Sequence, residues 1–501
     1  MKSAWRKGLT TCSLVGVLTP AVGLLTMMAT CRASEVSASE KPNILFIAVD
    51  DLRPQLGCYG QDQIISPNID RLAANGTIFT RAYCQVPVCG ASRASLLTGL
   101  RPTPKRFLDY YTWAKKDAPG ITDLPGWLKQ NGYETFSMGK IYHHASDNKD
   151  SWTQLGDERI TRPAFRDYHL PESKAPEGTK GWGGGAPYEC ADAPEDTYFQ
   201  YQLADAAIAR LREIKKSDKP GFLAVGFTKP HLPFVAPKKY WDLYKREELK
   251  LAPNPFAPKG APRQAMHNFG ELRNYRDIPK KGPVPDDLAL SLIHGYYACV
   301  SYTDAMIGRI MEELDRLDMR ENTIVILWGD HGWQLGEHAL WCKHANFNTS
   351  LNAPLIISAP GKSGGHKLSS LVEFVDIYPT LCELAGVQLP EHLQGTSFVP
   401  LLDAPGRPWK EAVFARYHDG DSVRTDRYLY TEWKKDGERV AAMLYDHETD
   451  PDENVNISEE PESAEIIKRM QGLLKAGWEP VAERVKKTVT APDESSSGHS
   501  N

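Results

Sequence analysis

The chain has 501 residues, a formal net charge of −5, 41% hydrophobic and 25% charged residues. This composition is typical of a globular protein long enough for two domains. The absence of a large basic excess argues against nucleic acid as a partner, whereas a small anionic substrate would need only a local cluster of cations.

Residues 1–38 are typical of an export signal, because basic residues precede an uncharged stretch over 8–31 and small residues follow. Pro20 interrupts the stretch and favours a cleaved signal, with cleavage after Ala33 or Ala38. Attachment of a lipid at Cys31, or an anchored form, stays open as an alternative. We therefore expect a periplasmic or extracellular protein with no stable membrane partner beyond this signal, since no other segment could span a membrane.

Apolar runs rich in β-branched residues alternate with helix-length segments over 41–390, the predicted catalytic domain. The predicted strands are 43–51, 134–144, 221–234, 323–332 and 353–361. The predicted helices are 66–76, with Ser66 at its N-cap and Gly76 as its stop, and 301–319. This alternation predicts an α/β fold with a large, mostly parallel sheet flanked by helices.

The remaining segments differ in composition. Segments 165–190 and 250–285 are rich in Pro, Gly and charge, and we expect long surface insertions there. Shorter strands over 412–418, 422–433 and 441–451, followed by a helix over 463–476, predict a smaller C-terminal α+β subdomain spanning 391–482. The polar tail, 483–501, is predicted to be disordered.

Polar residues follow four of the predicted strands. They are Asp50 with Asp51, Lys140 with His143, Lys229 with His231, and Asp330 with His331. Ligands of open α/β sheets bind beyond the carboxyl ends of the strands, so we expect these residues to converge on one site.

Three of these residues, Asp50, Asp51 and Asp330, are carboxylates. An isolated Asp-Asp pair is ordinarily a solvated turn or a helix cap. Here the apolar strand before the pair places it at the edge of the sheet, where close anions repel one another unless a cation lies between them. Three converging carboxylates favour a hard divalent cation such as Ca²⁺.

The cysteines are too sparse for a disulfide framework, although one or two disulfides stay open. Cys89 lies in VCGASRASLLTG, residues 88–99, a small and polar segment that opens a helix. A thiolate is a soft ligand and fits poorly with carboxylates around a hard cation. Cys89 is therefore either a buried cysteine remote from the metal or a residue whose sulfur is replaced. Five others are most simply buried apolar residues: Cys58, Cys190, Cys299, Cys342 and Cys382.

CGASRASLLTG resembles the signature of the formylglycine-dependent sulfatases of the alkaline-phosphatase-like superfamily, Cys-x-Pro/Ala-Ser-Arg followed by Leu-Thr-Gly. With GKIYH, KPHLPF, DHGWQLGEHALWCKHANF and LYDHETDPDENVN, the chain is similar to the iduronate-2-sulfatase branch from about 42 to about 456. The resemblance implies that a formylglycine-generating or radical-type sulfatase-maturing enzyme oxidises Cys89 to formylglycine, which exchanges sulfur for oxygen. Ala91 stands where proline is commonest, so conversion can depend on the host.

The resemblance also implies a ligand set for Ca²⁺. Its members would be Asp50, Asp51, Asp330 and an oxygen of the modified Cys89, with His331 counted among them. Nitrogen is an uncommon partner of Ca²⁺, so a role for His331 outside the direct ligands stays open.

Catalytic roles follow from the same resemblance. Arg93, Lys140 and Lys343 would hold the sulfate oxygens and stabilise formylglycine. The hydrated formylglycine would attack sulfur while His231 or Lys343 protonates the leaving alcohol, and His143 would help the second hydroxyl to expel sulfate.

The expected function is that of an exported, calcium-dependent sulfatase acting on a sulfated glycan, most like 2-O-sulfated iduronate or a related uronate. Three alternatives are a sulfatase for another sulfated polysaccharide, a phosphodiesterase or phosphonate hydrolase, and a glycan-binding pseudoenzyme with unmodified Cys89. The complete set of acids, cations and histidines argues against the pseudoenzyme.

Overall fold

The computed structural model describes residues 41–156, 160, 166–179 and 183–490. The export signal predicted over 1–38 lies outside these residues. Within the described ranges, no helix is both long enough and apolar enough to cross a membrane.

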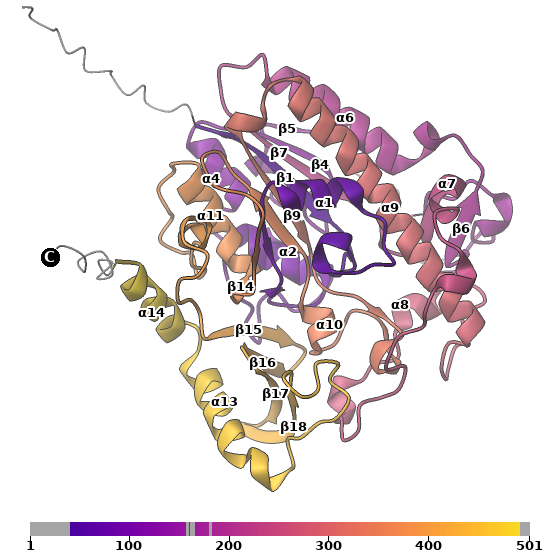
Figure 1. Cartoon of the computed structure of the whole chain (residues 1–501), viewed down its shortest axis with the longest axis vertical. Helices are drawn as coiled ribbons and strands as arrows, with labels where there is room; N and C mark the ends of the chain where they lie inside the picture. Colours follow the sequence, from indigo (N-terminus) through magenta and orange to yellow (C-terminus); the bar gives the residue numbers. More distant parts are fainter. Residues whose placement is uncertain (1–40, 157–159, 161–165, 180–182, 491–501) are drawn as a thin grey trace, which may run out of the picture. The chain divides into compact units, whose positions relative to one another are not determined.

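Eight strands form the central sheet (Figure 1). In spatial order they are β13 (His366–Leu368), β2 (Thr77–Phe79), β12 (Leu355–Ser358), β9 (Thr323–Gly329), β1 (Asn43–Val49), β7 (Gly221–Phe227), β4 (Glu134–Gly139) and β5 (Gln154–Leu155). Only β12 is antiparallel to its neighbours, β9 and β2; the other pairings are parallel. The predicted α/β fold with a mostly parallel sheet is therefore confirmed.

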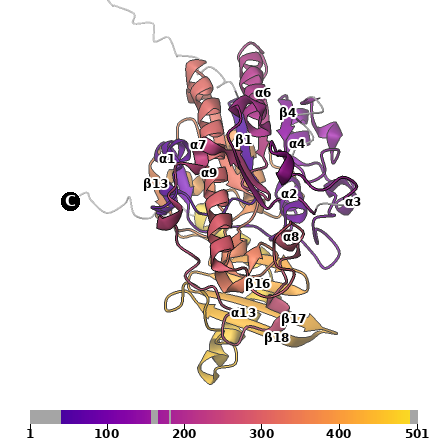
Figure 2. The same ribbon diagram turned by 90° about the vertical axis from the view of Figure 1, so that its right-hand side faces the viewer.

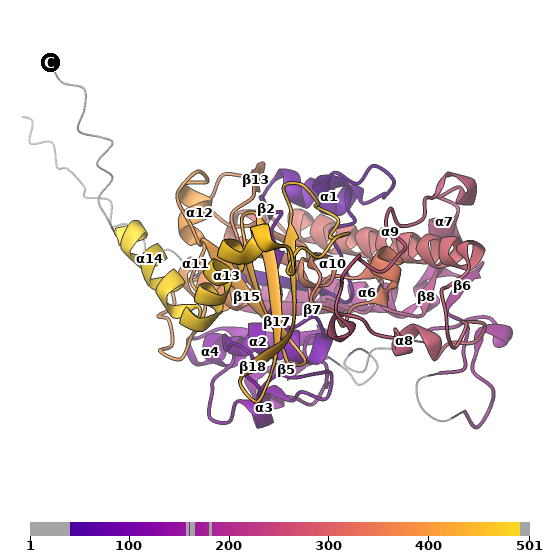
Figure 3. The same cartoon turned by 90° about the horizontal axis from the view of Figure 1, so that it is seen from below.

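Helices cover both faces of this sheet, as Figures 2 and 3 show from two directions. The face with Leu45 and Ile47 of β1 packs against α1 (Pro67–Ala74), α6 (Phe199–Ile214) and α9 (Asp286–Arg316). The face with Ile44 and Phe46 packs against α2 (Cys89–Thr98), α4 (Leu124–Gln130), α11 (Ile377–Leu384) and α12 (Val399–Asp403). Because both faces are covered, the strands are apolar throughout rather than alternating.

Short elements complete this part of the chain. Three two-stranded sheets pair β3 (Ala82–Tyr83) with β14 (Val372–Glu373), β6 (Tyr188–Ala191) with β8 (Phe234–Pro237), and β10 (Gln334–Leu335) with β11 (Trp341–Cys342). The short helices are α3 (Ala114–Asp117), α7 (Lys238–Trp241), α8 (Gly270–Arg273) and α10 (Asn348–Leu351). The helix α8 lies within the predicted insertion 250–285.

The C-terminal part is an antiparallel sheet of β15 (Ala412–Tyr417), β16 (Gly420–Thr425), β17 (Tyr428–Lys435) and β18 (Glu438–Asp446). A turn at Asp426 divides the predicted strand 422–433 in two. Ile467 and Met470 of α13 (Ala464–Ala476) pack on one face of this sheet. On the other face, Met443 and Tyr445 lie in one apolar cluster with Phe347 of the catalytic part.

Two predictions need correction. Helix α14 (Glu479–Thr490) occupies the first part of the tail that was predicted to be disordered, because Val481 and Val485 recur at helical spacing and are buried; residues 491–501 lie outside the described ranges. All seven described cysteines are free thiols, but Cys58 is half-buried and Cys190 is exposed rather than buried. Cys190 is exposed because side chains alternate on β6, a strand of a two-stranded sheet.

Candidate active site

Four parallel strands bring the predicted residues to one edge of the sheet. Strands β9, β1, β7 and β4 are adjacent and parallel, so their carboxyl ends coincide. The residues directly beyond these ends are Asp50 and Asp51, Lys140, His231, and Asp330 with His331. The first turn of α2 and the residue after β11 add Cys89 and Lys343 to the same cluster.

Buried cations hold the three aspartates in place. Asp50 Oδ2 accepts from Lys140 Nζ at 2.6 Å, and Asp50 Oδ1 accepts from Arg93 Nη2 at 3.1 Å. Arg93 Nε also donates to Asp330 Oδ2 at 2.8 Å. The backbone N–H of Asp51 donates to Asp330 Oδ1 at 3.0 Å. These contacts fix the mutual positions of the carboxylates.

Arg93 lies at the centre of this cluster. Its guanidinium is fully buried and bridges Asp50 and Asp330, and its Nη1 donates to the carbonyls of Lys140 and Ile141 at 2.5 and 3.0 Å. Arg93 therefore balances the charge of Asp50 and Asp330; its predicted role in holding a sulfate stays a prediction.

The donor set fits a divalent cation. Ligand atoms of Asp50, Cys89 and Asp330 all lie within 4.8 Å of one another, as do those of Asp51, Cys89 and His331. The buried Nε2 of His331 lies 3.4 Å from Asp51 Oδ1 and 3.6 Å from Asp330 Oδ1. Burial raises the pKa of Asp51 to about 7, although His231 and Lys343 oppose the shift. A cation at this point would favour the ionised carboxylate, and oxygen ligands suit Ca²⁺.

Cys89 begins helix α2 and is buried beside the carboxylates. Burial raises the pKa of its thiol, but Lys140, Lys343 and a hydrogen bond from His143 outweigh this effect and hold the pKa well below its usual range. The positive end of a helix favours the same charge. Such surroundings are typical of a reactive cysteine rather than an inert one.

Two proton-bearing groups stand beside this cluster. Lys343 Nζ lies 3.2 Å from Asp51 Oδ1, 2.8 Å from Glu271 Oε1 and 4.8 Å from the centre of a ring of the buried Trp333. His231 Nε2 lies 3.0 Å from Glu271 Oε1, and its Nδ1 lies 2.6 Å from the carbonyl oxygen of Leu232. Both ring nitrogens of His231 face oxygen acceptors, so this arrangement suits an imidazolium that can give up a proton.

Glu271 is a site residue that the sequence did not indicate. It lies on α8, within the predicted insertion, and its carboxylate contacts both Lys343 and His231. Glu271 lies in no recognisable sequence motif. The sequence indicated only that Lys343 and His231, if close together, would require a neighbouring carboxylate. Lys229 also has a structural role: its buried Nζ donates to the carbonyls of His231 and Pro233 and fixes their loop.

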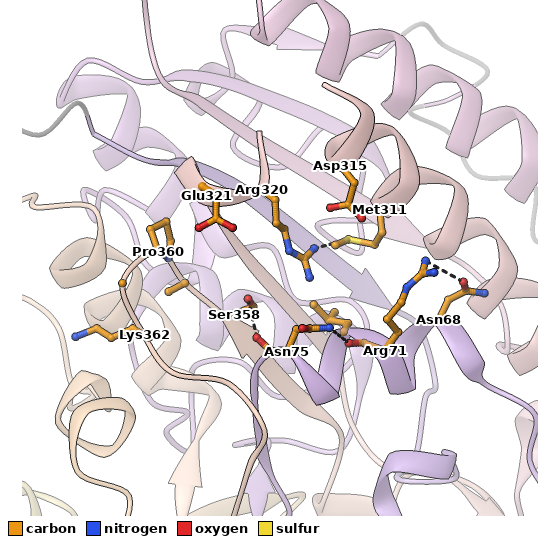
Figure 4. A pocket seen from close by; sticks show the side chains of 13 residues that line it. Asn68, Arg71, Asn75, Met311, Asp315, Arg320, Glu321, Ser358, Pro360 and Lys362 are labelled. Carbon is orange, nitrogen blue, oxygen red and sulfur yellow. Dashed lines mark hydrogen bonds between the residues drawn. The ribbon is translucent and has the colours of Figure 1, made fainter. Parts of the chain in front are cut away.

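His338, another histidine near these motifs, belongs to the core. It stacks on Phe347 and its ring nitrogens contact Gln334 and the backbone carbonyl of Asp452. A separate polar cavity of about 310 Å³ lies near the amino end of β9, where Figure 4 shows Arg71 and Arg320 with Asp315 and Glu321. This cavity shares no residue with the site.

Comparisons with known proteins agree with this geometry. The profile of the family described as Sulfatase matches residues 42–387, and that described as N-sulphoglucosamine sulphohydrolase, C-terminal, matches 336–478. The iduronate 2-sulfatase of Homo sapiens is 36% identical over 408 residues, which covers 72% of each chain.

Two solved structures share the fold. One, in complex with its substrate D-glucosamine-2-N,6-O-disulfate, has a TM-score of 0.71 and 22% identity and covers 91% of this chain and 100% of its own. The other, a phosphonate monoester hydrolase from Silicibacter pomeroyi, has a TM-score of 0.70 and 21% identity and covers 88% of this chain and 96% of its own. At these identities the likeness concerns the fold alone.

Proposed function

This chain belongs to the sulfatase family and is a sulfuric ester hydrolase, and we propose that it acts on a glycan, using a formylglycine made from Cys89 and Ca²⁺ as its metal. The observation that carries the proposal is the position of Cys89, at a helix N-terminus between Lys140 and Lys343 and beside three buried carboxylates. A buried structural cysteine that stays a neutral thiol would not be stabilised by the positive charge of Lys140 and Lys343.

Hydrated formylglycine at position 89 would supply a hydroxyl in place of the thiol, and Ca²⁺ held by Asp50, Asp51 and Asp330 would favour the ionised form of that hydroxyl. The rest is done by the chain. Lys140 and Lys343 place positive charge beside residue 89, where charge develops as the ester bond breaks. His231 holds a proton at Nε2 for the leaving alcohol, and His143, which hydrogen-bonds to residue 89, is placed to accept a proton there.

We propose that the substrate is a 2-O-sulfated iduronate, or a related sulfated uronate, that forms part of a glycan. Support comes from the 36% identity with human iduronate 2-sulfatase and from the resemblance of GKIYH, KPHLPF and DHGWQLGEHALWCKHANF to that branch. The proposal includes maturation of Cys89 by a formylglycine-generating or radical-type enzyme and export by the N-terminal signal.

The test is release of inorganic sulfate from a panel of disaccharides, measured by ion chromatography on protein made with a maturation enzyme. The panel contains 2-O-sulfated uronates, their positional isomers and a phosphonate monoester, with Cys89→Ala as the inactive control. We expect the highest kcat/KM on the 2-O-sulfated uronate. Faster turnover of the phosphonate would contradict the sulfatase assignment. Faster turnover of a positional isomer would contradict the proposed substrate. Binding without turnover would indicate a pseudoenzyme.

A further inference from the structure

Two neighbouring tyrosines are unusually exposed for their size. Tyr110 is 46% and Tyr111 67% exposed, and their ring centroids lie 4.1 Å apart at an interplanar angle of 36°. The two rings therefore form a small aromatic surface, which we call the tyrosine platform. Exposed apolar surface next to a polar site is a common mark of ligand binding.

The platform is attached to the helix that begins with Cys89. A Cβ added to Gly90, the residue after Cys89, would lie only 2.8 Å from the carbonyl oxygens of Asp109 and Tyr110. The backbone that carries the platform thus rests directly on the first turn of α2. The ring of Tyr110 also lies 6.3 Å from the ring of His143, which follows Lys140 of the site by three residues.

Local contacts keep the platform in a fixed position. The N–H of Tyr111 donates to Asp109 Oδ1 at 2.7 Å, which closes a tight turn. The ring of His144 stacks on Trp113 with 4.2 Å between ring centroids and meets the ring of His143 edge-on at 4.9 Å. The rings of Tyr110, His143, His144 and Trp113 therefore form one contiguous cluster, and the tyrosines are preorganised.

We propose that the tyrosine platform binds the ring of the sulfated sugar while its sulfate lies at residue 89, a specificity role that rests on the proposed function. The C–H groups on one side of a pyranose carry slight positive charge and pack on the negative face of an aromatic ring. The two phenol groups offer hydrogen bonds to ring hydroxyls at the same time. Asp109, the acidic residue of this turn, would repel a carboxylate or a sulfate. The platform therefore recognises the sugar ring itself rather than its negative charge.

The test compares ring removal with hydroxyl removal. In the mature enzyme, Tyr110→Ala/Tyr111→Ala should raise KM for the sulfated disaccharide about tenfold and leave kcat within about twofold, because binding is lost and the reacting groups remain. Tyr110→Phe/Tyr111→Phe keeps both rings and should stay within about threefold of wild-type KM. Leu243→Ala, at a residue 45% exposed after α7, is the matched control. An unchanged KM in the double alanine variant would overturn the proposal.

A binding measurement separates this proposal from the proposed function. Isothermal titration calorimetry would compare the affinity of two variants for the sulfated disaccharide, Cys89→Ser and Cys89→Ser/Tyr110→Ala/Tyr111→Ala. This measurement does not depend on turnover. Binding about tenfold weaker in the triple variant supports the platform even if no sulfate ester is hydrolysed. Equal affinities, or no binding by either chain, overturn it.

Discussion

At the scale of single residues, the site is a balance of buried charges. Asp50, Asp51 and Asp330 are fully buried, and each contacts at least one cationic side chain or backbone donor. His231 and Lys343 both contact the partly exposed Glu271, but the His231 side chain is 16% exposed whereas that of Lys343 is 2% exposed. The proton that the leaving alcohol needs is therefore held at the side of the cluster where substrate can approach.

His231→Ala removes this proton donor. We expect sulfate release to fall by about two to four orders of magnitude, the usual contribution of general acid catalysis. The circular dichroism spectrum and melting curve should stay close to wild type, because the ring is not part of the apolar core. Turnover within about threefold of wild type would exclude His231 from the reaction.

At the scale of elements, the sequence was most informative where apolar strands end in polar residues. The five strands predicted for the catalytic part are present, although β7 ends at Phe227 instead of 234, and the helix predicted over 301–319 is the end of α9, which begins at Asp286. Residues that follow β1, β4, β7 and β9 meet because parallel strands share an edge. Contacts made by loops could not be predicted, because α8 and the Tyr110 turn have no periodic pattern. Glu271 reaches Lys343 from 72 positions away in the chain, a separation on which local residue patterns give no information.

One strand contact allows an element-scale prediction. A Cβ at Gly226 on β7 would lie 2.0 Å from the carbonyl oxygen and 2.7 Å from the backbone nitrogen of Lys140. Gly226→Ala should therefore displace Lys140 and lower the free energy of unfolding by about 1–3 kcal/mol, as overpacking does. Denaturant titration and sulfate release would measure both effects. Gly406→Ala is the control, since no atom lies within 4 Å of its added Cβ; equal behaviour of the two variants would contradict the packing argument.

At the scale of the whole molecule, buried ion pairs connect the C-terminal sheet to the catalytic part. Glu373 accepts from both terminal nitrogens of Arg101 at 2.6 Å and from Lys410 Nζ at 2.8 Å. The N–H of Phe414 on β15 also donates to Glu373, at 3.0 Å. Lys410 in turn contacts Asp376 at 2.6 Å. Segments from three parts of the chain thus meet at one carboxylate.

This cluster makes stability depend on pH. Burial would raise the pKa of Glu373, but Arg101 and Lys410 outweigh it and lower the pKa from 4.5 to about 2. The contribution of Glu373 is therefore fully present above about pH 4.5 and is lost as the pH falls towards 2. Glu373→Gln should cost about 3 kcal/mol at neutral pH, with the difference from wild type shrinking below pH 4.5. A difference that does not change with pH would contradict this assignment.

Metal removal tests the site and the fold together. Exhaustive chelation should abolish sulfate release and lower the melting temperature, because a ligand that binds only the folded state stabilises it. Both properties should return with Ca²⁺. If activity persists after chelation, the three carboxylates do not hold a metal that the reaction needs.

The most direct test of the central claim is the mass of the peptide that contains Cys89, from protein made in its native host, with an aldehyde-reactive tag as confirmation. We expect the mass of formylglycine at position 89 in active protein. An intact thiol at position 89 in protein that releases sulfate would contradict it.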